Sequence, residues 1–390
     1  MNRENTVPQR RYDLDWLRVL AVFLLVPFHT ALIFSLDPDL IVYVKDHIES
    51  PALLMLAGFI NIWHMPLLFV IAGASTWFAL DRRSAGQYLG ERVSRLLIPA
   101  IFGLLVLIPP MTYLHTIGHP GKPSFWQFYP GFFHFNPNDL TGYRGSFTPA
   151  HLWFIIFLFV FSLAALPLFI WLKKPSSESL RAALGRFFSH RGNLLLAFIP
   201  LSLAGAVPLL GDKNPLHYLL LFVLGFLLFC DDRIKNAMDR DWPLYALLSA
   251  LGVLAYALTN NPFSSPWSPD WIVSGLVFQF SRWASVITFL GAAHRWLNFG
   301  SPFLNYTSKA AFPFYSLHLP VDTLIGIWVI RLALPVWLKF ALIVLLTTLA
   351  TLAIYEFFIR RIPILRFFFG VKHRRAMTST KPLSSTVSVR

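Results

Sequence analysis

The sequence predicts an all-α fold: a polytopic integral membrane bundle of about ten transmembrane helices, with both termini in the cytoplasm. Of the 390 residues, 56% are apolar and only 13% are charged, whereas soluble domains carry about 25% charged residues. The apolar residues gather into runs that approach the roughly 20 residues needed to cross a bilayer. The basic residues stand between these runs. This composition excludes a disordered chain, a secreted disulfide scaffold and almost any ordinary cytosolic enzyme.

Ten apolar stretches are candidate membrane spans, and the fifth and sixth are short. The first is not a cleavable signal peptide, because it begins with Asp15 and Arg18, is interrupted by Pro27 and His29, and lacks a small-residue cleavage site. The predicted spans are residues 15–36, 52–80, 96–117, 151–171, 193–210, 216–230, 242–258, 271–294, 310–332 and 336–358.

Lysine and arginine residues predict the orientation of the bundle. With the N-terminus inside, the inside segments hold 25 of them and the outside segments hold 5, and cytoplasmic loops carry this kind of excess. The sequence therefore predicts a cytoplasmic segment at 1–14, a transmembrane domain at 15–358, and a basic, partly disordered cytoplasmic tail at 359–390. The net charge of +14 thus reflects membrane topology, and nucleic acid is not an expected partner.

The predicted outside loop at residues 118–150 is long and rich in proline, glycine and aromatic residues, including Trp126. Loops of this length are often functional, and such rings can stack on sugars. The alternative is an aromatic belt at the membrane surface. The single Cys230 excludes an internal disulfide and a cysteine-based metal cluster, and no metal site is expected.

Arg18 and His29 are polar residues in the first predicted span. They are eleven positions apart, which is about 20° past three full helical turns, so they share one face about 16 Å apart along the axis. Charges at membrane depth cost about 3 kcal/mol or more, which makes them functional candidates. The guanidinium suits an anionic ligand, and the imidazole suits general-base catalysis. The alternative is an arginine that reaches the lipid headgroups and a histidine bonded to a neighbouring carbonyl.

Three further histidines lie in or beside predicted spans. His64 precedes Pro66, which frees backbone carbonyls upstream, so its ring has a structural alternative role in bonding one of them. His151 opens the fourth span, where histidine is often an interfacial anchor. His318 lies eight residues in from the inner end of the ninth span. We treat all three as candidates for a cavity or an acceptor site.

Arg282 lies near the middle of the eighth span and needs a partner or a wet cavity. The acidic residues Asp15 and Glu356 lie near span ends, which leaves Arg282 as a further candidate for an anionic ligand or a polar cavity.

Arg92 and Arg95 lie in the predicted cytoplasmic loop between the second and third spans. Residues three apart share a helix face, and two guanidinium groups on one face match phosphates well. The alternative is an ordinary excess of basic residues at the inner surface.

Taken in order, these segments resemble the acyltransferase family 3 membrane proteins over residues 12–358. That family has an arginine, ten intervening residues and a histidine in its first helix, followed by a cytoplasmic Arg-x-x-Arg motif. The matching segments here are Leu14–Arg18 continuing to His29, Phe69–Gly73, Arg92–Arg95, His151–Phe154 and Tyr315–His318. The chain is most similar to the glucan biosynthesis protein C branch, which modifies periplasmic glucans with succinyl groups.

The resemblance implies a membrane O-acyltransferase of the bacterial cytoplasmic membrane. It would move an acyl group, acetyl or succinyl, from cytoplasmic acyl-CoA to a hydroxyl of a glycan or glycolipid on the outer side. Acyl-CoA is then a co-substrate, and no permanently bound cofactor is expected. Arg92 and Arg95 would hold the CoA phosphates and Arg18 would face the donor. His29 would deprotonate the acceptor or carry the acyl group itself. Arg282, or a backbone N–H near a proline, would stabilise the oxyanion.

This interpretation requires a polar passage through the bundle, with His29 where donor and acceptor meet. Two alternatives belong to other classes. A transporter or flippase would explain buried arginine and histidine, but no inverted repeat is visible. A structural scaffold would leave the cost of burying Arg282 and His29 unexplained.

Overall fold

The structure is a computed structural model that describes residues 10–36, 43–116, 121, 123–136, 146–207, 209–210, 213–259, 265 and 267–371. Every regular element in these ranges is helical, which confirms the predicted all-α fold. The predicted disordered end of the tail, residues 372–390, and much of the loop at 118–150 lie outside the described residues.

The first predicted span is a broken helix. It consists of α1 (Tyr12–Phe23) and α2 (Leu25–Leu32). Pro27 has no N–H to donate to the carbonyl of Phe23, so the helical hydrogen-bond pattern is interrupted at this point. The second predicted span is α3 (Pro51–Leu80), which continues past Pro66.

The remaining predicted spans all coincide with helices or with series of short helical segments. The elements after α3 are α4 (Ala85–Arg92), η1 (Val93–Leu97), α5 (Ile98–Phe102), η2 (Gly103–Leu107), α6 (Ile108–Thr116), α7 (Phe125–Phe132), η4 (Ala150–Leu152), α8 (Trp153–Ala164), α9 (Leu166–Lys173), η5 (Pro175–Ser177), α10 (Glu178–Ser189), η6 (Asn193–Ala197), α11 (Phe198–Ala206), α12 (Pro215–Leu227), α13 (Asp232–Thr259), α14 (Pro269–Trp296), α15 (Pro302–Val329), α16 (Val336–Ile354), η8 (Tyr355–Ile359) and α17 (Pro363–Phe368).

Six helices in the described part of the chain are long and apolar enough to span a membrane, or seven if α8 and α9, bent by 52°, count as one span. The segment η6–α11 and helix α12 are shorter than a full span. Helix α15 has 28 residues, but it buries polar side chains such as Ser316, His318 and Asp322. The predicted count of ten spans and the cytoplasmic location of both termini stay predictions.

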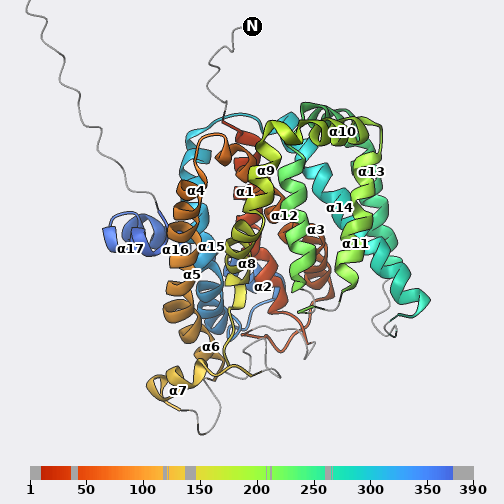
Figure 1. Ribbon diagram of the computed structural model, residues 1–390. Helices are drawn as coiled ribbons and strands as arrows, with labels where there is room; N and C mark the ends of the chain where they lie inside the picture. Colours follow the sequence, from red (N-terminus) through yellow and green to blue (C-terminus); the bar gives the residue numbers. More distant parts are fainter. Residues whose placement is uncertain are drawn as a thin grey trace, which may run out of the picture.

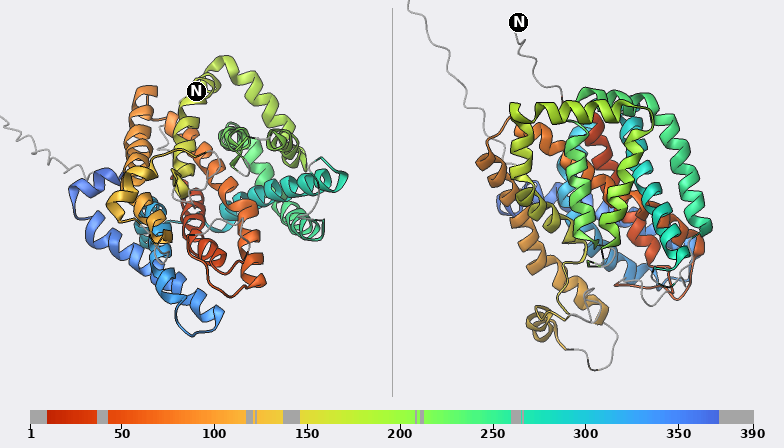
Figure 2. Two further views of the ribbon diagram at one scale, coloured as in Figure 1. Left: turned by 90° about the horizontal axis from the view of Figure 1, so that it is seen from below. Right: turned by 45° about the vertical axis from the view of Figure 1, so that its right-hand side comes forward.

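The bundle has two ends, which we name after the helices that lie there (Figure 1). The α10 end holds α10 and the start of α1, and the α7 end holds α7. Seen along the bundle, α15–α17 lie on one side and α13–α14 on the other, with α1 and α3 between them (Figure 2). Thus α10, in a predicted inside segment, and α7, in the predicted outside loop, lie at opposite ends.

Helices α3 and α12 touch backbone to backbone. A Cβ atom on Gly73 would lie 2.0 Å from the carbonyl oxygen of Phe222, and one on Gly225 would lie 2.1 Å from that of Val70. Only glycine permits this approach, which is how small residues bring membrane helices together. The contact fixes α12 against the central helix of the bundle.

A buried ion pair ties the chain between α2 and α3 to α16 at the α7 end. The Nζ of Lys339 lies 2.7 Å from Oδ2 of Asp46 and 2.9 Å from the carbonyl oxygen of Ile330. Both charged residues are buried, at 1% and 2% exposure. Each charge is therefore compensated inside the protein.

Candidate active site

A cavity of about 1060 Å³ lies in the half of the bundle next to the α10 end. Helices α1, α3, α4, α8 and α15 form most of its wall, and η1, η8 and the segment around α17 complete it. Seven cationic side chains and one carboxylate line it: Arg18, Arg83, Arg92, Arg95, Lys309, Arg360, Arg366 and Glu91. Its inner part is apolar and ends at Phe312 and Tyr315 of α15. The cavity is thus a strongly cationic chamber with an apolar inner part.

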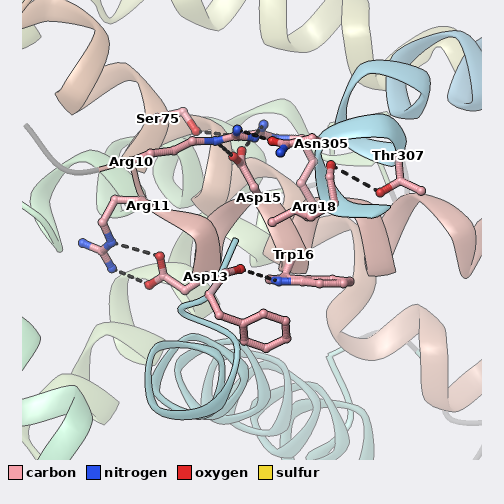
Figure 3. Close-up of polar contacts among 11 residues, drawn as sticks. Arg10, Arg11, Asp13, Asp15, Trp16, Arg18, Ser75, Asn305 and Thr307 are labelled. Atoms are coloured by element: carbon pink, nitrogen blue, oxygen red, sulfur yellow. Dashed lines mark hydrogen bonds and ion pairs between the residues drawn. The ribbon is translucent and has the colours of Figure 1, made fainter. Parts of the chain in front are cut away.

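Arg18 projects from α1 into this chamber. Its guanidinium donates to Oγ of Ser75 on α3 at 2.8 Å and to Oδ1 of Asp15 at 3.2 Å. Figure 3 shows Asp15 between Arg18 and Arg10, and Arg10 in turn donates to Asn305 of α15 at 2.6 Å. Arg18 keeps 37% of its side chain accessible, so the network orients the arginine and leaves it open to a ligand. Arg18 thus lies in the chamber, and its predicted role towards the donor stays a prediction.

Arg92 and Arg95 line the same chamber, as their predicted pairing requires. Arg92 ends α4, whereas Arg95 lies in the π-helical segment η1. The guanidinium of Arg92 lies 4.5 Å from the ring centre of Tyr88, and its buried Nε has no hydrogen-bond partner among the described residues. Neither Arg92 nor Arg95 makes an ion pair with a described residue. Two guanidinium groups therefore face the chamber without a counter-ion.

Three imidazoles gather deeper in the bundle, and we call His29, His151 and His318 the imidazole cluster. The ring centres of His29 and His318 are 5.2 Å apart, and those of His318 and His151 are 5.0 Å apart. His151 and His318 each bond a carbonyl of α15, through Nε2 to Ser316 and through Nδ1 to Tyr315. Nδ1 of His151 and Nε2 of His318 are buried and have no partner among the described residues. The ring of His29 makes no hydrogen bond to a described residue, so the cluster has unused proton-accepting capacity.

Tyr315 separates the cavity from the imidazole cluster. It lines the inner end of the cavity, its hydroxyl donates to the carbonyl of His151, and its ring centre lies 5.9 Å from that of His318. His29 is not among the residues that line the cavity. Tyr315 thus contacts both the cavity and the imidazole cluster, and the expected passage that reaches His29 stays a prediction.

The imidazole cluster and most of the residues that line the cavity lie within the segment that a known family covers. The family model described as an acyltransferase domain matches residues 11–356. The chain belongs to acyltransferase family 3. It is also similar to the glucans biosynthesis protein C of Escherichia coli K12 and of Escherichia coli O17:K52:H18, each 26% identical over 94% of this chain and 96% of the relative. No solved structure matches.

Membership of acyltransferase family 3 makes this chain an O-acyltransferase, and its apolar helices make it an integral membrane protein. The matched region contains each histidine and arginine predicted above for catalysis or CoA binding. The structure brings Arg18, Arg92 and Arg95 to one chamber and His29, His151 and His318 to one cluster. The described residues contain no group of three histidine, cysteine, aspartate or glutamate side chains placed to hold a metal ion.

Two buried groups have partners that the sequence did not predict. The carbonyl that Pro66 frees belongs to Ile62, and Nε of Arg282 donates to it at 3.0 Å. Nη1 of Arg282 also lies 3.1 Å from Nε2 of His217. His64 instead places Nε2 2.6 Å from the carbonyl oxygen of Ala21, just before the break between α1 and α2. The structure therefore gives Arg282 and His64 structural contacts.

The placement of His318 and His151 corrects two expectations about depth. Helix α15 begins at Pro302, eight residues earlier than the predicted span at 310. His318 therefore lies about 24 Å along the helix from its start, which brings it to His151. His151 is only 6% exposed and lies inside the bundle, so it is not an anchor at the membrane surface.

Trp126 is not among the residues that line the cavity. It is the second residue of α7 and is 79% exposed. The structure therefore leaves its ring open at the end of the bundle opposite the predicted donor entrance (Figure 1). Its contribution to an acceptor site stays a prediction.

Sequence reasoning missed several residues near these sites. Asp322 is buried in α15, and its Oδ1 accepts a hydrogen bond from Thr30, the neighbour of His29, at 2.7 Å. An acidic residue within the predicted span 310–332 was the signal for it. Arg360 and Arg366 line the cavity, although the sequence assigned them to the tail. The proline at 363 and the phenylalanines that follow it were the signal for a docked helix.

Proposed function

We propose that this membrane O-acyltransferase takes its acyl group, acetyl or succinyl, from acyl-CoA. The donor enters the cationic chamber from the cytoplasm at the α10 end. The acceptor is a hydroxyl of a glycan or glycolipid at the outer face of the bacterial cytoplasmic membrane. The observation that carries this proposal is the chamber itself, whose cations exceed its carboxylates by seven to one. An acyl-CoA brings about four negative charges on its phosphates.

The chamber offers different surroundings to the two parts of the donor, its phosphates and its acyl-pantetheine arm. Arg92 and Arg95 hold phosphate oxygens through charge-assisted hydrogen bonds, each contributing about 1.5–3 kcal/mol. Arg18, fixed by Ser75 and Asp15, faces the same ligand further in. The apolar walls towards Phe312 and Tyr315 suit the thin acyl-pantetheine arm.

The reaction proceeds in the imidazole cluster. The arm passes Tyr315 when that side chain turns, and the thioester carbonyl reaches His29. The ring of His29 accepts the proton of the acceptor hydroxyl while the hydroxyl oxygen attacks the carbonyl carbon. The new C–O bond forms, the C–S bond breaks, and the proton passes to the departing thiolate. The products are an acyl ester and free CoA.

Two features support a sugar acceptor at the α7 end. The relatives named glucans biosynthesis protein C point to glucan chemistry. Helix α7 presents exposed Trp126, and the ring of Tyr129 in this helix lies 5.3 Å from that of Phe133, the residue that follows it. Aromatic faces of this kind stack on sugar rings.

The test compares single variants of the purified protein in lipid nanodiscs. His29→Ala lowers kcat for acyl transfer from labelled acyl-CoA at least 100-fold, the loss expected for a missing general base, and leaves CoA affinity unchanged. Arg92→Gln weakens CoA binding about tenfold. His190→Ala, at an exposed histidine after α10, serves as the matched control and keeps full activity. Full activity of His29→Ala would overturn the catalytic assignment.

One further measurement separates the two chemical routes through His29. The protein is incubated with labelled acyl-CoA without acceptor, quenched and digested. If His29 only accepts a proton, no peptide is labelled. A labelled peptide containing His29 would show that the reaction passes through a covalent acyl-imidazole instead.

A further inference from the structure

The segment that follows the last long helix is docked on the chamber. Helix α17 and the turn after it, residues 363–371, lie past residue 356, where the family match ends. Phe368 stacks on Phe102 of α5 with ring centres 4.8 Å apart, and Phe369 is only 4% exposed. These apolar contacts hold the segment against α5, and we call it the C-terminal wall.

Gly370 sets how closely the C-terminal wall approaches the arginine motif. Its φ is +61°, a left-handed conformation that favours glycine. A Cβ atom there would lie 3.2 Å from Cα of Arg95 and 3.3 Å from its carbonyl oxygen. The turn is closed by a hydrogen bond from the N–H of Val371 to the carbonyl of Arg366 at 2.8 Å. The wall therefore touches the backbone of Arg95 and carries Arg366 beside it.

The C-terminal wall extends the cationic lining of the chamber. Arg366 lines the cavity, and so do Arg360 from the turn after η8 and Lys309 from α15. Glu356 compensates Arg360, with Nη1 to Oε1 at 2.7 Å. Lys309 makes no ion pair in the described part of the chain. The chamber thus has a second group of cations, beside Arg92 and Arg95 and contributed by other elements.

We propose that the C-terminal wall is part of the ligand site, and that Arg366 with Lys309 binds a phosphate group of the nucleotide thioester beside those held by Arg92 and Arg95. The inference rests on the proposed function. Its physical basis is charge: Arg92, Arg95 and Arg18 compensate at most three of the roughly four charges on such a ligand, and Arg18 is already paired with Asp15. A planar guanidinium on a docked helix is suited to a phosphate.

The experiment measures the Kd of CoA for the full-length protein in nanodiscs of neutral lipid. Arg366→Gln is expected to weaken CoA binding about tenfold, since a charge-assisted hydrogen bond of this size is lost. The matched control is Arg361→Gln, which removes the same charge five residues earlier, just before the C-terminal wall. Arg361 is exposed, does not line the cavity, and lies over the ring of Phe357, so its variant keeps the wild-type Kd.

A second ligand distinguishes phosphate binding from a general distortion of the chamber. Pantetheine has no phosphate, so Arg366→Gln and the wild-type protein bind it equally. An equal loss for CoA and pantetheine would overturn the proposal. An unchanged Kd for CoA in Arg366→Gln would also overturn it and leave the proposed function standing. Failure of the wild-type protein to bind CoA would instead overturn the proposed donor.

A third comparison tests the other source of the same chemistry, a phosphate of a lipid headgroup. The Kd measurements are repeated in nanodiscs that contain phosphatidylglycerol. A nucleotide site predicts the same ratio of Kd between Arg366→Gln and the wild-type protein in both lipids. A ratio that appears only with the anionic lipid would assign Arg366 to the membrane surface and overturn the proposal.

A variant without a charge change tests the docking itself. Gly370→Ala strains the left-handed turn and pushes the wall away from Arg95, so CoA binding weakens severalfold although every cation remains. The control is Gly86→Ala in α4, where a Cβ atom meets nothing within 4 Å and the Kd stays unchanged. Equal affinities for the two variants would show that the wall does not bind the ligand.

Discussion

The two halves of this bundle differ in how their charged side chains are paired. In the half next to the α10 end, Arg92, Arg95 and Lys309 face a large chamber without an ion pair among the described residues. In the half next to the α7 end, Lys339 is neutralised by Asp46 at 2.7 Å, and Asp322 accepts hydrogen bonds from Thr30 and Thr347. The difference indicates which half of the bundle binds a charged ligand. A buried charge is costly unless it is paired, so an excess on one side only is a binding feature.

The largest effect is expected where a buried pair is broken. Lys339→Met leaves Asp46 buried without its counter-ion and lowers the free energy of unfolding by about 3–5 kcal/mol. Reversible unfolding in mixed micelles measures this loss. The double variant with Asp46→Asn recovers part of it, and CoA affinity does not change. A loss below about 1 kcal/mol would mean that water already reaches this pair and would erase the contrast between the halves.

Arg18 tests the other half of the comparison. Arg18→Gln removes the charge that Ser75 and Asp15 orient, and weakens CoA binding about 10-fold to 100-fold. It changes stability little, because 37% of this side chain is accessible. Ser75→Ala serves as the milder comparison and costs no more than about tenfold. A large loss of stability in Arg18→Gln with unchanged Kd would assign this arginine to the fold.

Asp322 lies close to the imidazole cluster, because it accepts a hydrogen bond from Thr30, the neighbour of His29. We infer that it is a positioning residue, which holds α2 against α15 and α16. Asp322→Asn keeps an acceptor oxygen but weakens the bond from Thr30, so kcat falls about fivefold while the Kd of CoA stays constant. Equal changes in both quantities would indicate a general disturbance of the bundle instead.

The smallest effect is expected at α7. Trp126→Ala changes the free energy of unfolding by less than about 0.5 kcal/mol, since the residue is 79% exposed. We expect only the KM for the acceptor to rise, by severalfold, with donor Kd and kcat unchanged. Phe128→Ala on the same helix removes a buried ring and destabilises the protein, which separates folding from recognition. An unchanged acceptor KM in Trp126→Ala would remove this residue from the acceptor site.

The sequence predicted those features that depend on local pattern. Apolar runs predicted the long helices of the bundle, and the resemblance to the family implied that Arg18, Arg92 and Arg95 face one donor, which their shared chamber supports. Family resemblance was carried by segments that the structure brings together in two neighbouring sites. Helix limits were less predictable: α15 begins at Pro302 because Ser301 caps it, although the apolar run starts later.

What the sequence could not provide was the position of side chains between helices. Arg282 was expected to need a partner, an anionic ligand or a polar cavity, and the structure supplies a partner, the carbonyl on α3 that Pro66 leaves available. Tyr315 closes the inner end of the chamber because α15 and η4 meet there, which no pattern in either segment indicates. The role of residues 363–371 depends on docking against α5, and a count of basic residues placed them in a tail.

The glycine contact between α3 and α12 has a mechanical consequence. Two helices whose backbones touch cannot slide or tilt against each other without collision, so this side of the bundle is a rigid support during turnover. The neighbouring helices are interrupted instead: α1 and α2 lack a hydrogen bond at Pro27, and α15 contains prolines at 313 and 320. We therefore expect the helix motion that admits the acyl arm past Tyr315 to take place at those prolines.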